Sequence, residues 1–456
     1  MARGYAIRRR HASVCAETFV LNLLHSVALQ QQYERSEHEP WRAQRKILRL
    51  ARRACHVRAG IVRLGTGLLR PACFLSVIHE TRGWSYGLIS AAISVHFLLG
   101  AITGANLPAL HRRFGTSGVI KIGALLMATG IMAWAHANAP WQLFVAAVLS
   151  GTGWGTMSAA ALNAVVSPWF VRTRPAALGM AYNGGSVGGI IFSPLWVFAI
   201  NGVGFPAAAA AITIVMAVTL WLLADRVFSR TPETMGLQPD GDAPGAPATS
   251  VMSPAALPLP GALLWRDRRF ISLAAGMTLG LFAQIGLIAH LYSLLGPALG
   301  PQCAGWAMGL VTLMAIAGRT LLGWLMPLGT DRRLVACAGC IAQMAGSIAL
   351  IVAGGTIVPL LLTGIILFGL GFGNATSLPP LIAQVEFVKA DVPRVAALIV
   401  AIAQGGYAIA PVFFGVIREL TPPAAAIAAG NAPVFFAAAA LVQCLAVVAF
   451  LAGRRR

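Results

Sequence analysis

The sequence is dominated by apolar runs of about 20 residues that are separated by short polar gaps. A run of this length suits an α-helix that crosses the hydrocarbon core of a bilayer, where only helices and closed barrels satisfy all their backbone hydrogen bonds. Charged residues make up 11% of the chain, whereas soluble domains carry about 25%. These features predict an all-α, multi-pass protein embedded in a lipid bilayer. Eleven clear runs lie at roughly 87–109, 118–137, 141–167, 175–200, 204–224, 270–295, 303–327, 333–353, 357–380, 395–417 and 431–453.

Basic residues between the runs set a predicted direction of crossing. They cluster in alternate gaps, from "HRR" at 111–113 to the terminal "RRR", while the opposite gaps carry only Arg82 and Arg418 as Lys or Arg. Cytoplasmic loops are enriched in these residues, so the basic gaps and both termini are predicted to be cytoplasmic, with the chain in the inner (plasma) membrane. The basic residues that give the net charge of +20 are then assigned to cytoplasmic segments. No nucleic-acid partner is expected.

This alternation requires one more crossing before the first clear run. The only candidate is roughly 57–78, which contains Arg58, Arg63 and Arg70. Each arginine costs about 2.5–3.5 kcal/mol on insertion scales, so the first span is predicted to be atypical. Two explanations are open. The arginines snorkel or face a polar cavity, or the start or reading frame of the basic residues 1–70 is not the authentic one.

The second part of the chain repeats the first. Three motifs recur at offsets of 218 to 222 residues with the same predicted direction of crossing. Such a parallel repeat predicts twelve transmembrane helices in two six-helix halves. The predicted segments are a basic N-terminal segment (1–56), an N-terminal half (57–225), a cytoplasmic linker (226–268), a C-terminal half (269–453) and a basic tail (454–456). The motif pairs are "GWSYGLIS" (83–90) with "GWAMGLVT" (305–312), "GTGWGTMS" (151–158) with "GLGFGNATS" (369–377), and "RPAAL" (174–178) with "RVAAL" (394–398).

Twelve spans, the repeat and the long central loop resemble the major facilitator superfamily over about residues 57–453. Within that family, "GWSYGLIS", "NAVVSPWFVRTRPAALGMAYNGGSVGG" and the linker motif "RTPETMGLQPDGD" are similar to the monocarboxylate-porter and oxalate/formate-antiporter branch. The resemblance implies a secondary transporter that works by alternating access. It implies no enzyme activity, no cofactor and no metal, and a monomeric state.

The loop after the second span departs from the family pattern. The family usually has an Asp-Arg-x-Gly element there, whereas this chain reads "RRFG", with Arg112 at the position of the acid and Arg113 after it. The corresponding loop of the second half keeps Asp331, Arg332 and Arg333. The resemblance implies that both loops take part in cytoplasmic gating, and the departure leaves open how the first-half loop is latched.

Arg319 lies near the middle of the run that contains "MAIAGRTLLGWLM". An arginine stays charged in ordinary environments, and snorkelling from this depth is difficult, so Arg319 should face the bundle interior or a water-filled cavity. A guanidinium offers two parallel hydrogen bonds to a carboxylate, and in the resembling family an arginine in this span contacts the substrate carboxylate. The alternative is a structural arginine that bonds helix carbonyls or the Asp331 loop.

Two departures narrow the expected substrate. Monocarboxylate porters tend to carry an acid one turn before this arginine, where this chain has Ala315. Oxalate-type members carry a second cation in the eleventh span, which here offers Gln404 and Tyr407. One fixed positive charge suits one carboxylate, so the prediction is a small organic monocarboxylate, and oxalate is disfavoured.

His96 aligns with Gly318, beside Arg319, at the repeat offset of 222. Because a histidine titrates near neutral pH, His96 is the candidate for proton coupling and for substrate contact, and the substrate's own carboxyl group is the other possible proton carrier. The alternative is a histidine bonded to a neighbouring helix. Further residues that could line the cavity, or equally form helix-to-helix hydrogen bonds, are Asn163, Tyr182, Asn183, Gln284, Tyr292, Asn374, Gln404 and Tyr407.

The sequence therefore predicts a carrier of a small organic anion, with a proton as a possible second partner. One alternative is an exporter of amphiphilic compounds or drugs, in which Arg319 is structural. A remote alternative is an intramembrane serine hydrolase that uses Ser186 of "GGSVG". The G-x-S-x-G pattern of a nucleophile elbow needs a strand–turn–helix context, which this apolar run does not predict.

Overall fold

The computed structural model describes residues 71–454, apart from short gaps and the longer stretches 236–260 and 421–431. All regular secondary structure within these ranges is helical, which confirms the predicted fold class. The predicted segment 1–56, most of the predicted first span 57–78 and most of the predicted linker lie outside the described residues. The short gaps are 167, 171–173, 231, 233–234, 327–329 and 389–390.

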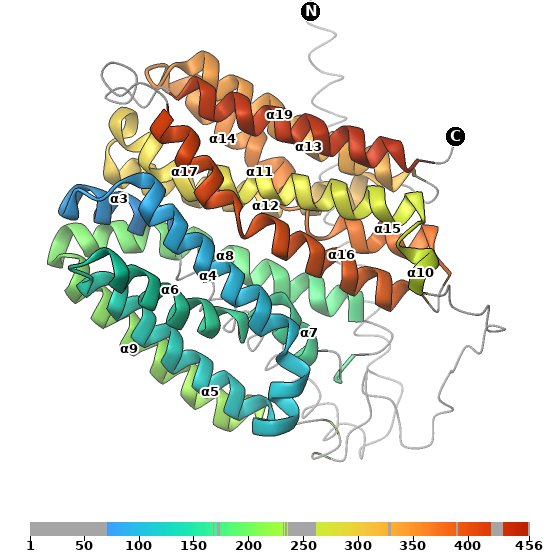
Figure 1. The fold of residues 1–456 in the computed structure, drawn as a ribbon, viewed down its shortest axis with the longest axis horizontal. Helices are drawn as coiled ribbons and strands as arrows, with labels where there is room; N and C mark the ends of the chain where they lie inside the picture. The colour runs from blue at the N-terminus through green and yellow to red at the C-terminus, as the bar shows by residue number, and fades with distance from the viewer. Residues whose placement is uncertain are drawn as a thin grey trace, which may run out of the picture. The chain divides into compact units, whose positions relative to one another are not determined.

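The helices form two groups, coloured blue to green and yellow to red in Figure 1. The first group contains α3 (Pro71–Arg82), α4 (Tyr86–Ala105), α5 (Leu107–His136), α6 (Pro140–Gly155), α7 (Ala159–Val166), α8 (Arg174–Val203), α9 (Phe205–Leu223) and the π-helical turn η1 (Ala224–Phe228). The second group contains α10 (Gly261–Leu264), α11 (Arg268–Leu299), α12 (Pro301–Leu325), α13 (Arg332–Ala353), α14 (Val358–Phe372), α15 (Leu378–Glu386), α16 (Val392–Tyr407), α17 (Ala410–Leu420) and α19 (Pro433–Ala452).

Eight helical segments among the described residues are long and apolar enough to cross a membrane, and they match eight of the predicted runs. The prediction of one continuous helix is wrong for 141–167 and 357–380, and the run 395–417 also has a short interruption between Tyr407 and Ala410. The first of these runs is divided into α6 and α7, and the second into α14 and α15. Both breaks fall at the ends of Gly-rich motifs, "GTGWGTMS" and "GLGFGNATS", because glycine weakens a helix interior.

Glycine and proline together make two short connections between long helices. Gly204 and Gly300 adopt positive φ angles of 80° and 76° at the N-caps of α9 and α12. A proline occupies the first turn of each of these helices, where its missing N–H costs nothing. The chain therefore reverses direction within a few residues, and α8 and α11 run antiparallel to the helices that follow them.

Within each group the helices approach closely at small residues. In the first group α6 packs on α4 and α5, and α9 packs on α5. In the second group α13 lies between α14 and α19, and α11 contacts α16 and α19. The groups meet where α8 packs on α12, α4 on α17 and α3 on α11 (Figure 1).

Two opposite ends of the helix bundle are named here by their residues. The Arg418 end carries the C-termini of α3 and α17 and the N-terminus of α4, and sequence predicts it to face outward. The Asp331 end carries the N-terminus of α13 and the C-termini of α15 and α19, and sequence predicts it to be cytoplasmic. Figure 1 shows these elements at opposite sides of the view.

Candidate substrate site

The break between α14 and α15 is the feature of the second group that collects predicted site residues. Backbone carbonyls at a break lose their intrahelical N–H partners and need others inside an apolar bundle. Gln284 of α11 donates from Nε2 to the carbonyl of Phe372, 3.3 Å away. Arg319 of α12 donates from Nε to the carbonyl of Gly373, 3.1 Å away. Two side chains from different helices therefore hold the end of α14.

Asn374 lies in the same break and is 6% exposed. Its Nδ2 atom is 3.4 Å from the carbonyl of Leu370, but its Oδ1 atom is buried and has no hydrogen-bond partner among the described residues. Such an unsatisfied buried acceptor is costly. The structure thus brings Arg319, Gln284 and Asn374 to one turn and leaves that turn with an acceptor that a ligand or water can satisfy.

Close packing of α12 on α14 places Arg319 at this turn. A Cβ atom added to Gly318 would lie 2.1 Å from the carbonyl oxygen of Leu370, and one added to Gly373 would lie 2.1 Å from the carbonyl oxygen of Ala315. The two backbones are therefore in direct contact. Ala315 is 1% exposed. An acid at this position, as monocarboxylate porters tend to have, would therefore be buried where α12 crosses α14.

The first group contains an equivalent break between α6 and α7. Thr156 donates its hydroxyl to the carbonyl of Gly153 at 2.8 Å, and Ser158 is 5% exposed with an Oγ atom that has no partner among the described residues. Sequence reasoning noticed the repeated motif but missed Ser158. The signal that could have found it is the polar residue that ends each Gly-rich motif.

His96 is buried in the first group, with 4% exposure. Its Nδ1 atom lies 2.9 Å from the hydroxyl of Ser150 on α6, and Trp134 of α5 donates to the same hydroxyl at 3.0 Å. The ring also lies tilted by 41° against the ring of Trp154, at a centroid distance of 5.8 Å. The structure thus joins His96 to neighbouring helices of its own group, and no hydrogen bond connects it with the described residues of the α14–α15 break.

The remaining predicted cavity residues are dispersed. Tyr407 of α16 is 8% exposed, and its ring meets Phe97 of α4 edge-on across the junction of the two groups. Gln404 is half-buried one turn earlier. Tyr182 and Asn183 lie in α8, but their side chains are outside the described residues.

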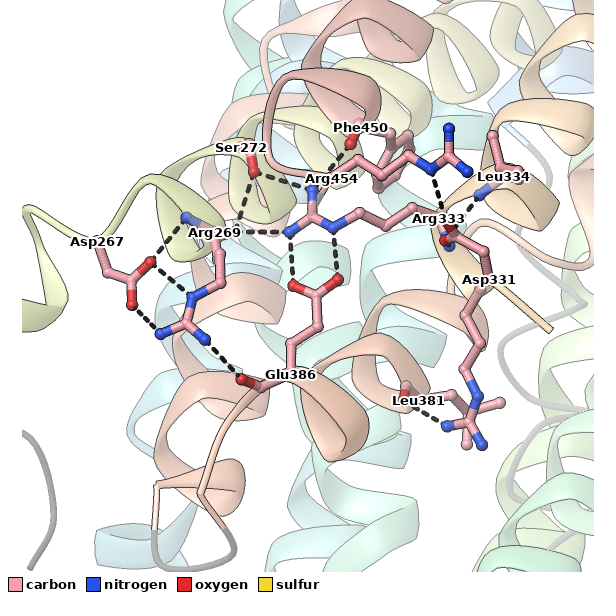
Figure 2. Close-up of polar contacts among 11 residues, drawn as sticks. Asp267, Arg269, Ser272, Asp331, Arg333, Leu334, Leu381, Glu386, Phe450 and Arg454 are labelled. Carbon is pink, nitrogen blue, oxygen red and sulfur yellow. Dashed lines mark hydrogen bonds and ion pairs between the residues drawn. The ribbon is translucent and has the colours of Figure 1, made fainter. Parts of the chain in front are cut away.

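The predicted second-half gating loop forms a cluster of charged residues at the Asp331 end (Figure 2). Arg333 is 1% exposed and binds both carboxylate oxygens of Glu386, at 2.6 and 2.8 Å. It also donates to the hydroxyl of Ser272 and to the carbonyls of Phe450 and Arg269, at 2.9 to 3.0 Å. This single side chain therefore connects α13 with α11, α15 and α19, all in the second group.

Asp331 caps α13 by accepting hydrogen bonds from the N–H groups of Arg333 and Leu334, and it pairs with Arg454 (Figure 2). Partial burial raises the pKa of the Asp331 carboxyl, but the hydrogen bonds from Arg454 and from the two N–H groups outweigh burial, so the pKa is lowered. Arg332 donates to the carbonyl of Leu381 at 2.6 Å.

Asp267 caps α11 at the same end and pairs with Arg269 at 2.7 Å. The side-chain hydrogen bond from Arg269 lowers the pKa of Asp267, although burial opposes this. Arg269 also donates to the backbone carbonyl of Glu386 at 3.0 Å (Figure 2). The cluster therefore holds the ends of four helices of the second group together.

The predicted first-half gating loop is built differently. Arg112 and Arg113 are exposed, and the guanidinium of Arg113 lies 5.3 Å from the ring centroid of Phe114. Ser117 donates to the carbonyl of Ala224 at 2.9 Å. Lys121 forms an ion pair with Asp225 at the end of α9, with side-chain exposures of 24% and 52%. Within the described residues, the first group thus has a partly exposed lysine pair, whereas the second group has a buried arginine that bonds to Glu386.

Comparison with known proteins defines the family. Residues 59–411 match the Major Facilitator Superfamily, and the chain therefore belongs to this superfamily of membrane transporters. This superfamily consists of multi-pass membrane transporters and not of enzymes, so the family assignment argues against the hydrolase alternative at Ser186.

Sequence relatives agree with this assignment. Monocarboxylate transporter 13 of Bos taurus is 28% identical over 222 residues, which cover 48% of this chain and 47% of the relative. Monocarboxylate transporter 11 of Mus musculus is 30% identical over 233 residues, which cover 48% of this chain and 46% of the relative. The chain spans about half the length of the curated relatives that it matches.

Solved structures share the fold. The nucleoside transporter NupG superimposes with a TM-score of 0.68 at 15% identity, covering 88% of this chain and 98% of that chain. A D-xylose-proton symporter superimposes with a TM-score of 0.65 at 15% identity, covering 87% and 96%. The predicted major facilitator fold is thus confirmed.

Proposed function

We propose that this transporter carries a small organic monocarboxylate across the inner membrane by alternating access, and that Arg319 binds the carboxylate. The observation that carries the proposal is the position of Arg319 at the α14–α15 break, within an apolar bundle, where it donates to the carbonyl of Gly373, the residue before Asn374. Broken helices mark the substrate sites of secondary carriers. The relatives named monocarboxylate transporters support the substrate class.

The geometry assigns separate tasks to the groups at the break. The bond from Nε of Arg319 to the Gly373 carbonyl orients the plane of the guanidinium, and a carboxylate binds such a plane through parallel N–H groups. Gln284 holds the preceding carbonyl and keeps the turn in place. The Oδ1 atom of Asn374 accepts a hydrogen bond from a substrate hydroxyl, so hydroxy acids are expected to bind better than their unsubstituted counterparts.

The proton is best carried by the substrate's own carboxyl group. His96 was the other predicted carrier, but it is buried in an apolar group of helices and bonded to Ser150. Charging it there would place a second uncompensated cation in the bundle. A substrate that crosses as the neutral acid needs no such step, and proton coupling then survives replacement of His96.

Uptake of labelled monocarboxylates into proteoliposomes with an inward proton gradient tests this function. Arg319→Gln should lower kcat/KM by roughly 100-fold, as expected for the loss of charge-assisted hydrogen bonds to a desolvated anion. Arg268→Gln is the matched control, because Arg268 is an exposed arginine at the N-terminus of α11, outside the predicted site and gating loops. Uptake that persists in Arg319→Gln would show that the arginine only holds Gly373, and the exporter alternative would replace the proposal.

A further inference from the structure

Arg418 of α17 is a buried arginine at the Arg418 end that has no acidic partner among the described residues. It is 3% exposed, and its guanidinium carbon lies 3.6 Å from the ring centroid of Tyr86 on α4. Nη1 donates to the hydroxyl of Ser293 on α11. The Nε atom is buried and has no hydrogen-bond partner in the described structure.

A buried charge without a counter-ion is costly, and arginine cannot lose its proton to avoid the cost. The aromatic face of Tyr86 offsets part of it. Arg333 is an equally buried arginine with a structural role, and it makes five hydrogen bonds, two of them to the Glu386 carboxylate. Arg418 instead retains an N–H group that points to no acceptor.

The acids closest to Arg418 in the sequence and the fold are committed elsewhere. Glu419 accepts a hydrogen bond from the N–H of Gly87 at 2.7 Å, and Glu80 accepts one from the hydroxyl of Ser76 at 2.8 Å. The sequence that follows α17, residues 421–431, contains no Asp or Glu. Among the described residues no carboxylate pairs with Arg418, so a bound anion would supply the counter-ion that it lacks there.

The surroundings of Arg418 connect the two groups of helices. Tyr86 belongs to the first group, whereas Ser293 and Arg418 belong to the second. Beside them the N–H of Val412 in α17 donates to the hydroxyl of Ser94 in α4 at 3.1 Å. Separation of α4 from α17 at this end would bring Arg418 into contact with a solute that passes between the groups.

We propose that Arg418, held by Ser293 and stacked on Tyr86, forms a second binding site for a monocarboxylate at the Arg418 end. The carboxylate accepts hydrogen bonds from the Nε edge of the guanidinium, and its charge balances the buried cation. The substrate class rests on the proposed function, but the existence of an anion site rests only on Arg418 and its surroundings. The site lies at the junction of the groups, distinct from the α14–α15 break inside the second group.

Equilibrium binding of radiolabelled benzoate to the purified full chain in lipid nanodiscs tests the proposal. Wild type should bind two molecules per chain, Arg418→Gln and Arg319→Gln one each, and the double variant none. Benzamide, a neutral molecule of the same shape, should not compete. Unchanged stoichiometry in Arg418→Gln, or a wild type without saturable benzoate binding, overturns the second site. Binding that is lost in Arg418→Gln but unaltered in Arg319→Gln supports this site and refutes the role proposed for Arg319.

A conservative variant separates binding from folding. Arg418→Lys keeps the charge but not the planar fork, so it should keep the second site with about tenfold weaker affinity. Unaltered affinity in this variant would contradict recognition through the guanidinium edge. Arg454→Gln is the matched control, since Arg454 pairs with Asp331 at the opposite end, and its binding should equal that of wild type.

Discussion

The two groups of helices connect their elements at the Asp331 end by different chemistry. The second group uses Arg333, a 1% exposed arginine with a two-point bond to Glu386. The first group uses Ser117 and the partly exposed pair of Lys121 and Asp225. A buried arginine fork is rigid, whereas an exposed lysine pair is weak and screened by salt. The two groups thus join helix ends by connections that differ in position and in expected strength.

The largest expected effect comes from removing the acid of the buried pair. Glu386→Ala leaves Arg333 buried without its counter-ion, which should lower the free energy of unfolding by about 3–5 kcal/mol. Asp225→Ala, which breaks the partly exposed pair with Lys121 in the first group, should cost about 0–1 kcal/mol. Denaturant unfolding of both variants in mixed micelles measures the difference. If both variants lost the same free energy of unfolding, the two groups would not differ in the strength of these connections.

The next largest loss of unfolding free energy is expected from glycine-to-alanine substitutions where two helices cross in close contact. Gly318→Ala places a methyl group 2.1 Å from the Leu370 carbonyl, so overpacking should cost about 1–3 kcal/mol and displace Arg319 from Gly373. Gly151→Ala should cost a similar amount in the first group, because its methyl group would lie 2.3 Å from the carbonyl of His96.

Gly405→Ala is the control for these crossings, since nothing lies within 4 Å of its added Cβ. It should be neutral or slightly stabilising. Thermal unfolding of the three variants, followed by uptake assays, separates the effects. The idea of a tight crossing fails if Gly318→Ala behaves like Gly405→Ala.

Breaking the hydrogen bond between Ser117 and Ala224 in the first group should lower the free energy of unfolding by a smaller amount. Ser117→Ala removes the hydrogen bond to the carbonyl of Ala224, and should lower the free energy of unfolding by about 0.5–1.5 kcal/mol. The loss should be independent of salt, whereas that of Asp225→Ala should diminish at high salt. Unfolding curves at low and high ionic strength distinguish the neutral bond from the ion pair. A salt-dependent loss in Ser117→Ala would contradict this division.

The smallest effect concerns acid stability of the second group. The pKa of Asp267 is lowered by its bond with Arg269, so this carboxylate stabilises the fold above its unfolded pKa of about 3.9, and the contribution is lost as the pH falls through the lower folded value. Asp267→Asn keeps the helix cap and should lose about 0.5 kcal/mol or less at pH 6. Unfolding temperatures of wild type and variant should converge near pH 3, and a constant gap would contradict the titration.

Sequence patterns predicted the helical spans and the repeat well because both depend on local hydrophobicity. Eight described segments match predicted runs. The breaks at 156–158 and 373–377 were not predicted, since glycine in an apolar run is equally typical of close helix packing. Whether such a run bends or stays straight depends on the neighbours that satisfy its carbonyls.

The candidate site was predicted only in part for the same reason. Arg319, Gln284 and Asn374 were recognised as polar residues in apolar runs, but their meeting at one turn depends on how α11 and α12 pack on α14. Arg418 was read as a loop charge because it lies at the end of its run. Its burial by Tyr86 and Ser293 is visible only in the fold.

By itself the sequence determined that this chain is an all-helical, multi-pass membrane protein, because bilayer hydrocarbon imposes length and polarity on every crossing segment. Tertiary structure decided which charges are paired. Arg333 has a carboxylate from a helix that begins 45 residues later, at Leu378, whereas Arg418 has an aromatic ring and a hydroxyl. The energy of a buried charge depends on the atoms that surround it, and packing of distant segments sets those atoms.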